Sequence, residues 1–303
     1  MNAKALSRDS GSRSTEAVPA GRLVCRDVSK TFVRKGRPLL AIDNASLTVE
    51  PGEFVALVGP SGCGKSTLLR LIDGLSRVDG GEIEVGGKRV TRPGPDRAFV
   101  FQSDSLLPWR SVEANVAVGL ELRRVPRREA RAEVARLLEM VGLSDFAERY
   151  PHELSGGMRQ RVNMIRALAV DPAVLLMDEP FSALDAQTRE LMQAEVTRLW
   201  LASRKTVLFV THSIEEAVFL ADRVLVMSSR PGRIKKEFPI SLPRPREVGI
   251  QRTPEFSEIA RAIWEELRAD VLRSFAIETN NEQMLAELNA EIDREAEGSG
   301  DRG

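Results

Sequence analysis

Cysteine and histidine are scarce in this sequence: the 303 residues include two of each, and only 5% are aromatic. Two cysteines cannot build a disulfide framework, so we expect a reducing compartment. No apolar run approaches the roughly 20 residues that a membrane-spanning helix needs, and residues 1–21 lack the apolar core of a secretory signal. We therefore expect a chain that is soluble by itself and reaches a membrane only by docking.

An excess of charge is also missing, because 44 Lys and Arg balance 44 Asp and Glu. This balance argues against a nucleic-acid footprint, and we predict no nucleic-acid partner. Apolar residues make up 42% of the chain, enough for a substantial core, and the length indicates one large domain or two small ones. Residues 1–20, which are polar and rich in Ser, Arg and Gly, are predicted to be disordered.

A glycine-rich stretch between a strand pattern and a helix pattern is the strongest motif that is present. It reads Gly59-Pro-Ser-Gly-Cys-Gly-Lys-Ser-Thr67 and matches the phosphate-binding loop G-x-x-x-x-G-K-[ST]. The backbone amides of such a loop, with the positive end of the helix dipole, form an anion site. Lys65 is predicted to reach the β- and γ-phosphates, and the Ser66 hydroxyl to hold Mg²⁺. The predicted nucleotide-binding residues of the loop are Gly59, Pro60, Ser61, Gly62, Cys63, Gly64, Lys65, Ser66 and Thr67.

Short apolar runs alternate with helical patterns along the chain. The pattern predicts buried strands at 54–58, 97–101, 173–177, 206–210 and 224–227, and helices at 111–143, 155–169, 190–201 and 214–221. This alternation predicts an α/β fold with a mainly parallel sheet and helices on both faces. Further strand patterns lie at 23–28, at 46–50 before a Pro51-Gly52 turn, and at 82–85 between glycine turns, the last as a hairpin or short antiparallel strand.

Two adjacent carboxylates, Asp178 and Glu179, follow the predicted strand at 173–177. A strand end would hold both groups at the edge of the sheet where α/β folds bind ligands. In nucleotide hydrolases of this type Asp178 would steady the Mg²⁺ shell and Glu179 would polarise the attacking water. Taken alone, however, an Asp-Glu-Pro sequence is equally compatible with an ordinary loop.

A second motif, Leu154-Ser-Gly-Gly-Met-Arg-Gln-Arg161, opens another predicted helix. Ser155, Gly156 and Gly157 would form a second anion-binding helix N-terminus. With this motif the sequence resembles the ATP-binding cassette (ABC) ATPases, and the resemblance covers about residues 23–227. It implies a P-loop NTPase (RecA-like) core with an antiparallel β subdomain and an α-helical subdomain at about 103–165, all within an ABC ATPase domain at 21–245.

The resemblance also implies roles for residues outside the two motifs. Gln102 matches the glutamine that senses Mg²⁺ and the attacking water, and His212 matches the histidine that contacts the γ-phosphate and orients the base. Phe32 matches the aromatic residue that stacks on adenine, with a core phenylalanine as the alternative. The segment 182–185 matches a dimer contact, so Asp185 joins the predicted ATP-binding residues.

The resemblance implies a head-to-tail pair, in which each loop at Ser155 closes on the γ-phosphate that Lys65 of the other copy holds. Phe101-Gln-Ser-Asp-Ser-Leu-Leu-Pro-Trp109 and Ser228-Ser-Arg-Pro-Gly-Arg-Ile234 resemble the nitrate/sulfonate/taurine importer branch. This implies an ATPase on the cytoplasmic face of the membrane, bound to permease subunits and served indirectly by an external solute-binding protein. The exposed anchors for a permease helix would be Leu106, Leu107 and Trp109, with packing inside the helical subdomain as the alternative.

Other interpretations remain open at this point. A soluble ABC ATPase of translation or DNA repair is the alternative function, although one cassette and no heptad run argue against it. The second motif and His212 argue against a P-loop kinase or GTPase. The arginines at 123, 124, 127, 128 and 131 predict a solvated helix face, with contact to anionic lipid as the alternative. Residues 246–303 are predicted to form a C-terminal helical extension with a disordered end, which is regulatory, dimerising or a cover for the core.

Overall fold

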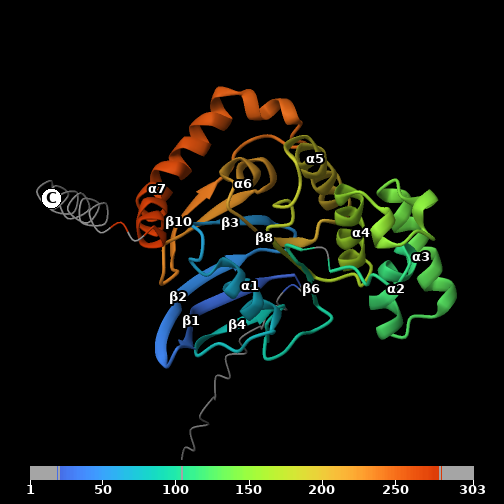
Figure 1. The fold of residues 1–303 in the computed structure, drawn as a ribbon, viewed down its shortest axis with the longest axis horizontal. Coiled ribbons are helices and arrows are strands. Elements are labelled where there is room, and N and C mark those ends of the chain that lie inside the picture. The colour runs from blue at the N-terminus through green and yellow to red at the C-terminus, as the bar shows by residue number, and fades with distance from the viewer. Residues whose placement is uncertain (1–18, 20, 104, 280, 282–303) are drawn as a thin grey trace, which may run out of the picture.

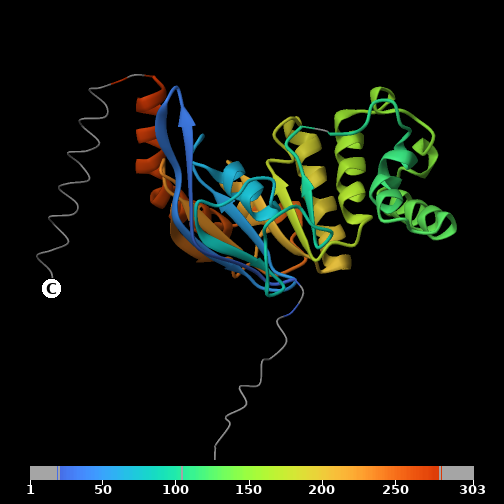
Figure 2. The same cartoon turned by 90° about the horizontal axis from the view of Figure 1, so that it is seen from below.

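The computed structural model describes residue 19, residues 21–103, residues 105–279 and residue 281. The predictions of disorder at the two ends fall almost wholly outside these residues. Figure 1 shows the described chain as two sheets and a helical arm along one long axis, and Figure 2 shows the same order from below. None of the helices in the described ranges has both the length and the apolar character that crossing a membrane requires.

A six-stranded sheet forms the centre, with the order β10-β9-β3-β8-β7-β6. Its neighbours are parallel except for β10, which pairs antiparallel with β9. The inner strands β3, β7 and β8 are buried along their whole length, because both faces of the sheet are covered. The strands are β3 (Phe54–Val58), β6 (Arg97–Val100), β7 (Val174–Asp178), β8 (Thr206–Thr211), β9 (Arg223–Met227) and β10 (Ile234–Pro239).

A second, antiparallel sheet lies against the first, with helix α1 (Lys65–Asp73) between them (Figure 1). Leu68, Leu69 and Ile72 of α1 share one buried cluster with residues of both sheets. The order of this sheet is β2-β1-β4-β5 and each neighbouring pair is antiparallel, so the predicted antiparallel subdomain is confirmed. Its strands are β1 (Leu23–Arg34), β2 (Arg37–Val49), β4 (Gly80–Val85) and β5 (Lys88–Arg89).

Helices cover the other face of the main sheet and extend past its β6 edge. The covering helices are α5 (Ala186–Ser203), α6 (Ile214–Leu220) and α7 (Pro254–Glu278), and α7 arches over α6 (Figure 1). The arm, at the opposite end of the molecule from the β1–β2 hairpin in both views, contains α2 (Val112–Leu122), α3 (Arg127–Met140) and α4 (Gly156–Leu168). Short 3₁₀ turns lie at Ser144–Phe146, Pro151–Glu153 and Val248–Arg252.

The structure divides one predicted helical stretch and adds one strand. The helical pattern at 111–143 forms two helices, because α2 ends at Leu122, Arg124 has a left-handed φ of 56° and Pro126 stands before α3. Proline disfavours helical geometry in the residue before it and has no N–H to donate. Strand β10 has no counterpart in the prediction, because its exposed residues 235–237 give no apolar alternation at this sheet edge.

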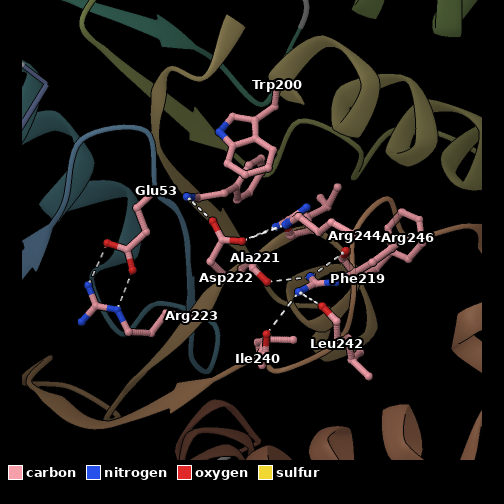
Figure 3. Close-up of polar contacts among 12 residues, drawn as sticks. Glu53, Trp200, Phe219, Ala221, Asp222, Arg223, Ile240, Leu242, Arg244 and Arg246 are labelled. Atoms are coloured by element: carbon pink, nitrogen blue, oxygen red, sulfur yellow. Dashed lines mark hydrogen bonds and ion pairs between the residues drawn. The ribbon is translucent and has the colours of Figure 1, made fainter. Parts of the chain in front are cut away.

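Arg244 and Arg246 bind the segment between β10 and α7, the connector, to the core (Figure 3). The buried Arg246 donates to three carbonyls at the C-terminal end of α6, where a cation also meets the negative end of the helix dipole. Desolvation lowers the pKa of Arg246 to about 10. Arg244 pairs with Asp222 at 2.8 Å and lies 4.3 Å from the ring centre of Trp200. The division of the chain at residue 245 stays a prediction.

Candidate functional site

The carboxyl ends of four neighbouring strands carry the predicted site residues. The phosphate loop follows β3, Gln102 follows β6, Asp178 ends β7 with Glu179 directly after it, and His212 follows β8. Parallel strands end at one edge of their sheet, so residues distant in the sequence meet there. Ser66 and Asp178, for example, are 112 positions apart and share a hydrogen bond.

The phosphate loop is closed around the amine of Lys65. This side chain is 5% exposed, and its Nζ donates to the carbonyls of Gly59 and Pro60 at 2.8 and 2.9 Å. Gly64 has a φ of 117°, and a Cβ there would lie 2.7 Å from Cδ1 of Ile42, so glycine is required on both counts. The loop thus presents its backbone and a lysine at the start of α1, which suits a phosphate.

The side chains of Ser66 and Asp178 form a pair of oxygen donors beside the loop. The Ser66 hydroxyl donates to Oδ1 of Asp178 at 2.8 Å, and Asp178 is 5% exposed. Burial raises the pKa of Asp178 above its ordinary value, and the neighbouring charge of Glu179 acts in the same direction. Mg²⁺ prefers such oxygen ligands and takes the rest of its shell from water and substrate phosphates. The two residues therefore fit this cation.

No group of three or more His, Cys, Asp or Glu side chains among the described residues could hold a metal ion without other ligands.

Glu179 lies between His212, which is predicted to orient it, and Gln102, which is predicted to sense Mg²⁺ and the attacking water. Its Oε2 is 3.1 Å from Nδ1 of His212 and 3.4 Å from Nε2 of Gln102. Glu179 has a left-handed φ of 45°, and its N–H donates to the carbonyl of Val210, which ties this strained residue to β8. The arrangement presents a carboxylate that can take a proton from water, held by a histidine and a glutamine.

The second predicted phosphate-binding end lies on the arm. Ser155 caps α4 by accepting a hydrogen bond from the N–H of Met158 at 3.3 Å. A Cβ at Gly157 would lie 2.9 Å from Cγ2 of Thr188, so the start of α4 packs closely against α5. This end, with Gly156, belongs to the arm, whereas the phosphate loop leads into α1 between the sheets (Figure 1). The structure groups Lys65, Gln102, Asp178, Glu179 and His212 at the sheet edge, and it leaves Ser155, Gly156 and Gly157 apart from them.

Asp185 begins α5, next to the start of α4. Its side chain accepts the N–H of Thr188 at 2.9 Å and the hydroxyl of the same residue at 2.7 Å. These two bonds hold the pKa of Asp185 below its ordinary value, and the bond from the backbone N–H has the larger effect. In the single chain Asp185 therefore serves as a helix cap.

The exposed fraction of each side chain decides between a binding role and a packing role for several predicted residues. The Phe32 ring is 41% exposed with Nζ of Lys30 5.5 Å from its centre, which suits stacking better than a core role. Trp109 is 71% exposed, whereas Leu106 is 8% exposed and packs inside the arm. The Cys63 side chain is buried, so this residue can contact a nucleotide only through its backbone, and burial also raises the pKa of its thiol.

Sequence reasoning overlooked Thr211 and Glu216, which flank His212. Glu216 is 5% exposed and accepts the Thr211 hydroxyl at 2.6 Å. A helix-capping pattern in the sequence could have indicated Glu216, because Ser213 caps α6 and Glu216 is the third residue of that helix.

The loop between β3 and α1 and the carboxylates at the next strand ends define a P-loop NTPase. The ABC transporter family matches residues 42–182. An uncharacterised ABC transporter ATP-binding protein of Methanocaldococcus jannaschii is 48% identical over 254 residues, which are 84% of this chain and 94% of that protein. The chain belongs to the ABC transporter family, and the prediction of an ABC-type ATPase is confirmed.

Other similar proteins carry more specific names. The taurine import ATP-binding protein of Rhizobium johnstonii is 50% identical, with 78% of this chain and 90% of that protein covered. The nitrate import ATP-binding protein of Synechocystis sp. is 48% identical, with 80% and 93% covered. Among solved structures, the dimeric post-hydrolysis ATP-binding cassette MJ0796 with ADP and Pi matches with a TM-score of 0.65 and 31% identity, over 73% of this chain and 99% of that one.

Proposed function

We propose that this chain is the ATP-hydrolysing subunit of an importer for a small oxyanion or organosulfur solute of the nitrate, sulfonate or taurine type. Relatives that are 43% to 50% identical and named for aliphatic sulfonate, nitrate and taurine import support this solute class. The observation that carries the hydrolytic part is Glu179, held between His212 and Gln102 at the edge that also bears the phosphate loop.

The residues at the sheet edge would divide the chemistry among them. Lys65 and the loop amides bind the phosphates of ATP. Ser66 and Asp178 hold Mg²⁺, which neutralises charge on the phosphates when it is bound. Glu179 accepts the proton of the attacking water, and the contacts of its Oε2 keep the carboxylate in one orientation.

A second copy would supply the other half of each site. The start of α4, from Ser155 to Gly157, would close on the γ-phosphate bound by the other copy in a head-to-tail pair. The dimeric form of the solved cassette supports a pair. ATP would favour the closed pair and hydrolysis would release it, so the motion could drive two permease subunits between their conformations.

The permease would dock on the arm. A groove of about 610 Å³ lies between α2 and α3, with Ala117, Val134 and Leu138 in its lining. Arg110 forms a 2.8 Å ion pair with Glu121, which lines the groove. The exposed Trp109, next to Arg110 in the chain, therefore lies near the groove. A groove with an apolar floor, charged residues such as Glu113 and Arg131 in its lining and an exposed tryptophan nearby suits a short helix of a membrane subunit.

Reconstitution with a candidate permease and solute-binding protein tests the proposal. We expect co-purification with a polytopic membrane protein on the cytoplasmic side, and ATPase stimulation in vesicles by nitrate, taurine or an alkanesulfonate. A chain that co-purifies with ribosomes or DNA, and whose hydrolysis no permease or solute changes, would instead indicate the soluble alternative.

A further inference from the structure

A single buried hydroxyl fixes the turn from which His212 projects. Thr211 is 1% exposed; its hydroxyl donates to Oε2 of Glu216 at 2.6 Å and accepts the N–H of Ser213 at 3.0 Å. The backbone on both sides of His212 is therefore tied to the carboxylate of Glu216.

The other oxygen of Glu216 faces the predicted dimer segment. Its Oε1 lies 3.6 Å from Nε of Arg189, and Nη2 of Arg189 donates to the carbonyl of Leu184 at 3.0 Å. Leu184 belongs to the segment 182–185 that leads into α5. Glu216 thus stands between the His212 turn on one side and this segment on the other.

Burial of a carboxylate is unfavourable unless partners compensate it. Glu216 is 5% exposed, and burial raises its pKa, while Thr211 and Arg189 act in the opposite direction. The His212 side chain, by contrast, is 59% exposed, so little packing holds the ring. Its 3.1 Å contact with Glu179 therefore depends on the turn that Thr211 and Glu216 fix.

We infer that Glu216 is a positioning residue for hydrolysis: through Thr211 it sets the His212 turn, and through Arg189 it links that turn to the segment 182–185. The inference rests on the proposed roles of His212 and Glu179. Glu216 touches neither the loop nor Lys65 in the described structure, so its loss is expected to change the rate of hydrolysis and leave the affinity for ATP near that of the wild type.

The first test replaces the hydroxyl and keeps the shape of the side chain. Thr211→Val should lower kcat by roughly 10- to 100-fold, the scale for a misplaced catalytic group. The KM for ATP should stay within about twofold, since the phosphate site is unchanged. Thr211→Ser retains the hydroxyl and is the matched control, with kcat close to that of the wild type. Melting curves and ATP binding verify that each variant is folded.

The second test breaks the link to Arg189. The amide of Glu216→Gln still accepts the Thr211 hydroxyl, so this variant keeps the turn and loses the charge. We expect kcat to fall in both Glu216→Gln and Arg189→Met, and the double variant to lose little more than either one, because all three interrupt the same link. This pair also carries the test if Thr211→Val does not fold.

Histidine resonances give a readout that stability alone would not move. The chain contains two histidines, and His152 lies outside the site as an internal reference. We expect Thr211→Val, which removes the hydroxyl that fixes the turn, to shift the His212 ring signals and leave those of His152 unchanged.

Wild-type kcat in both Thr211→Val and Glu216→Gln would overturn the inference, as would equal losses in the Val and Ser variants or unshifted His212 signals. Glu179→Gln separates this result from the proposed function. If Glu179→Gln is inactive and the Thr211 and Glu216 variants are normal, only the positioning role fails. If Glu179→Gln hydrolyses ATP normally, the proposed function fails.

Discussion

Replacement of Glu179 by glutamine removes a proton acceptor and changes almost nothing else in the site. The Oε2 contacts at 3.1 Å to His212 and 3.4 Å to Gln102 can both be kept by an amide oxygen. The loss therefore reports the general base alone, which is worth about 10²- to 10⁴-fold in rate. At about 1.36 kcal/mol for each tenfold change, the barrier should rise by roughly 2.7–5.4 kcal/mol.

The assay compares ATP hydrolysis at saturating Mg²⁺-ATP with ATP binding by the same preparation. Glu179→Gln should bind ATP as the wild type does, because the phosphate loop is intact, and should hydrolyse it at the reduced rate. Glu215→Gln is the matched control, since Glu215 is exposed and its carboxylate contacts only the Ser213 hydroxyl in the described hydrogen bonds. Hydrolysis by Glu179→Gln at the rate of the control would refute the role of Glu179.

Three further predictions concern the metal site, the arm and the connector. Asp178→Asn should abolish Mg²⁺-dependent hydrolysis yet raise the melting temperature of the nucleotide-free protein. Burial raises the pKa of Asp178, so the folded state holds its proton more tightly and wild-type stability falls as the pH rises above the unfolded pKa; Asn removes that dependence. Trp109→Ala should keep basal ATPase but weaken permease binding roughly tenfold or more, as measured by co-purification or titration. Arg246→Met should lower the free energy of unfolding by about 1–3 kcal/mol in urea, because buried carbonyls of α6 lose their donor.

Each of these three predictions has a result that contradicts it. A melting temperature of Asp178→Asn that equals that of the wild type at neutral pH, with the same change between acid and neutral pH, would mean that burial of this carboxylate does not cost stability. Wild-type assembly of Trp109→Ala would show that the exposed Trp109 is not a contact for the permease. A wild-type unfolding midpoint for Arg246→Met would show that the hydrogen bonds from Arg246 to the α6 carbonyls add nothing to the free energy of unfolding.

The buried strands could be predicted from the sequence because their signal is local. Phe54–Val58 is apolar throughout and is a strand with the predicted bounds, since both of its faces are covered. Edge elements were harder, as β10 shows, because solvent-facing residues give no apolar pattern. Pro126 is a readable stop signal within the helical pattern at 111–143, and it marks the break between α2 and α3.

The site was predictable where a motif fixes the chemistry of each position. The loop at Lys65 and the carboxylates at Asp178 and Glu179 fall into this class, and the sheet brings them to one edge. Glu216 could not be found this way, because its importance depends on burial and on side chains from two other elements, Arg189 of α5 and Thr211 of β8, that meet it in space. Sequence also cannot place Ser155 relative to Lys65, since that distance depends on how two copies meet.

A mixing experiment tests most directly whether each ATP site is shared by two copies. Lys65→Ala disables the phosphate loop, and Ser155→Arg blocks the exposed start of α4 without filling a buried space. Each variant alone should be inactive, whereas an equal mixture should recover roughly a quarter of the wild-type sites, because half of the random head-to-tail pairs contain one intact site. A mixture as inactive as its components, or a strictly monomeric form that hydrolyses ATP at the full rate, would contradict the shared site.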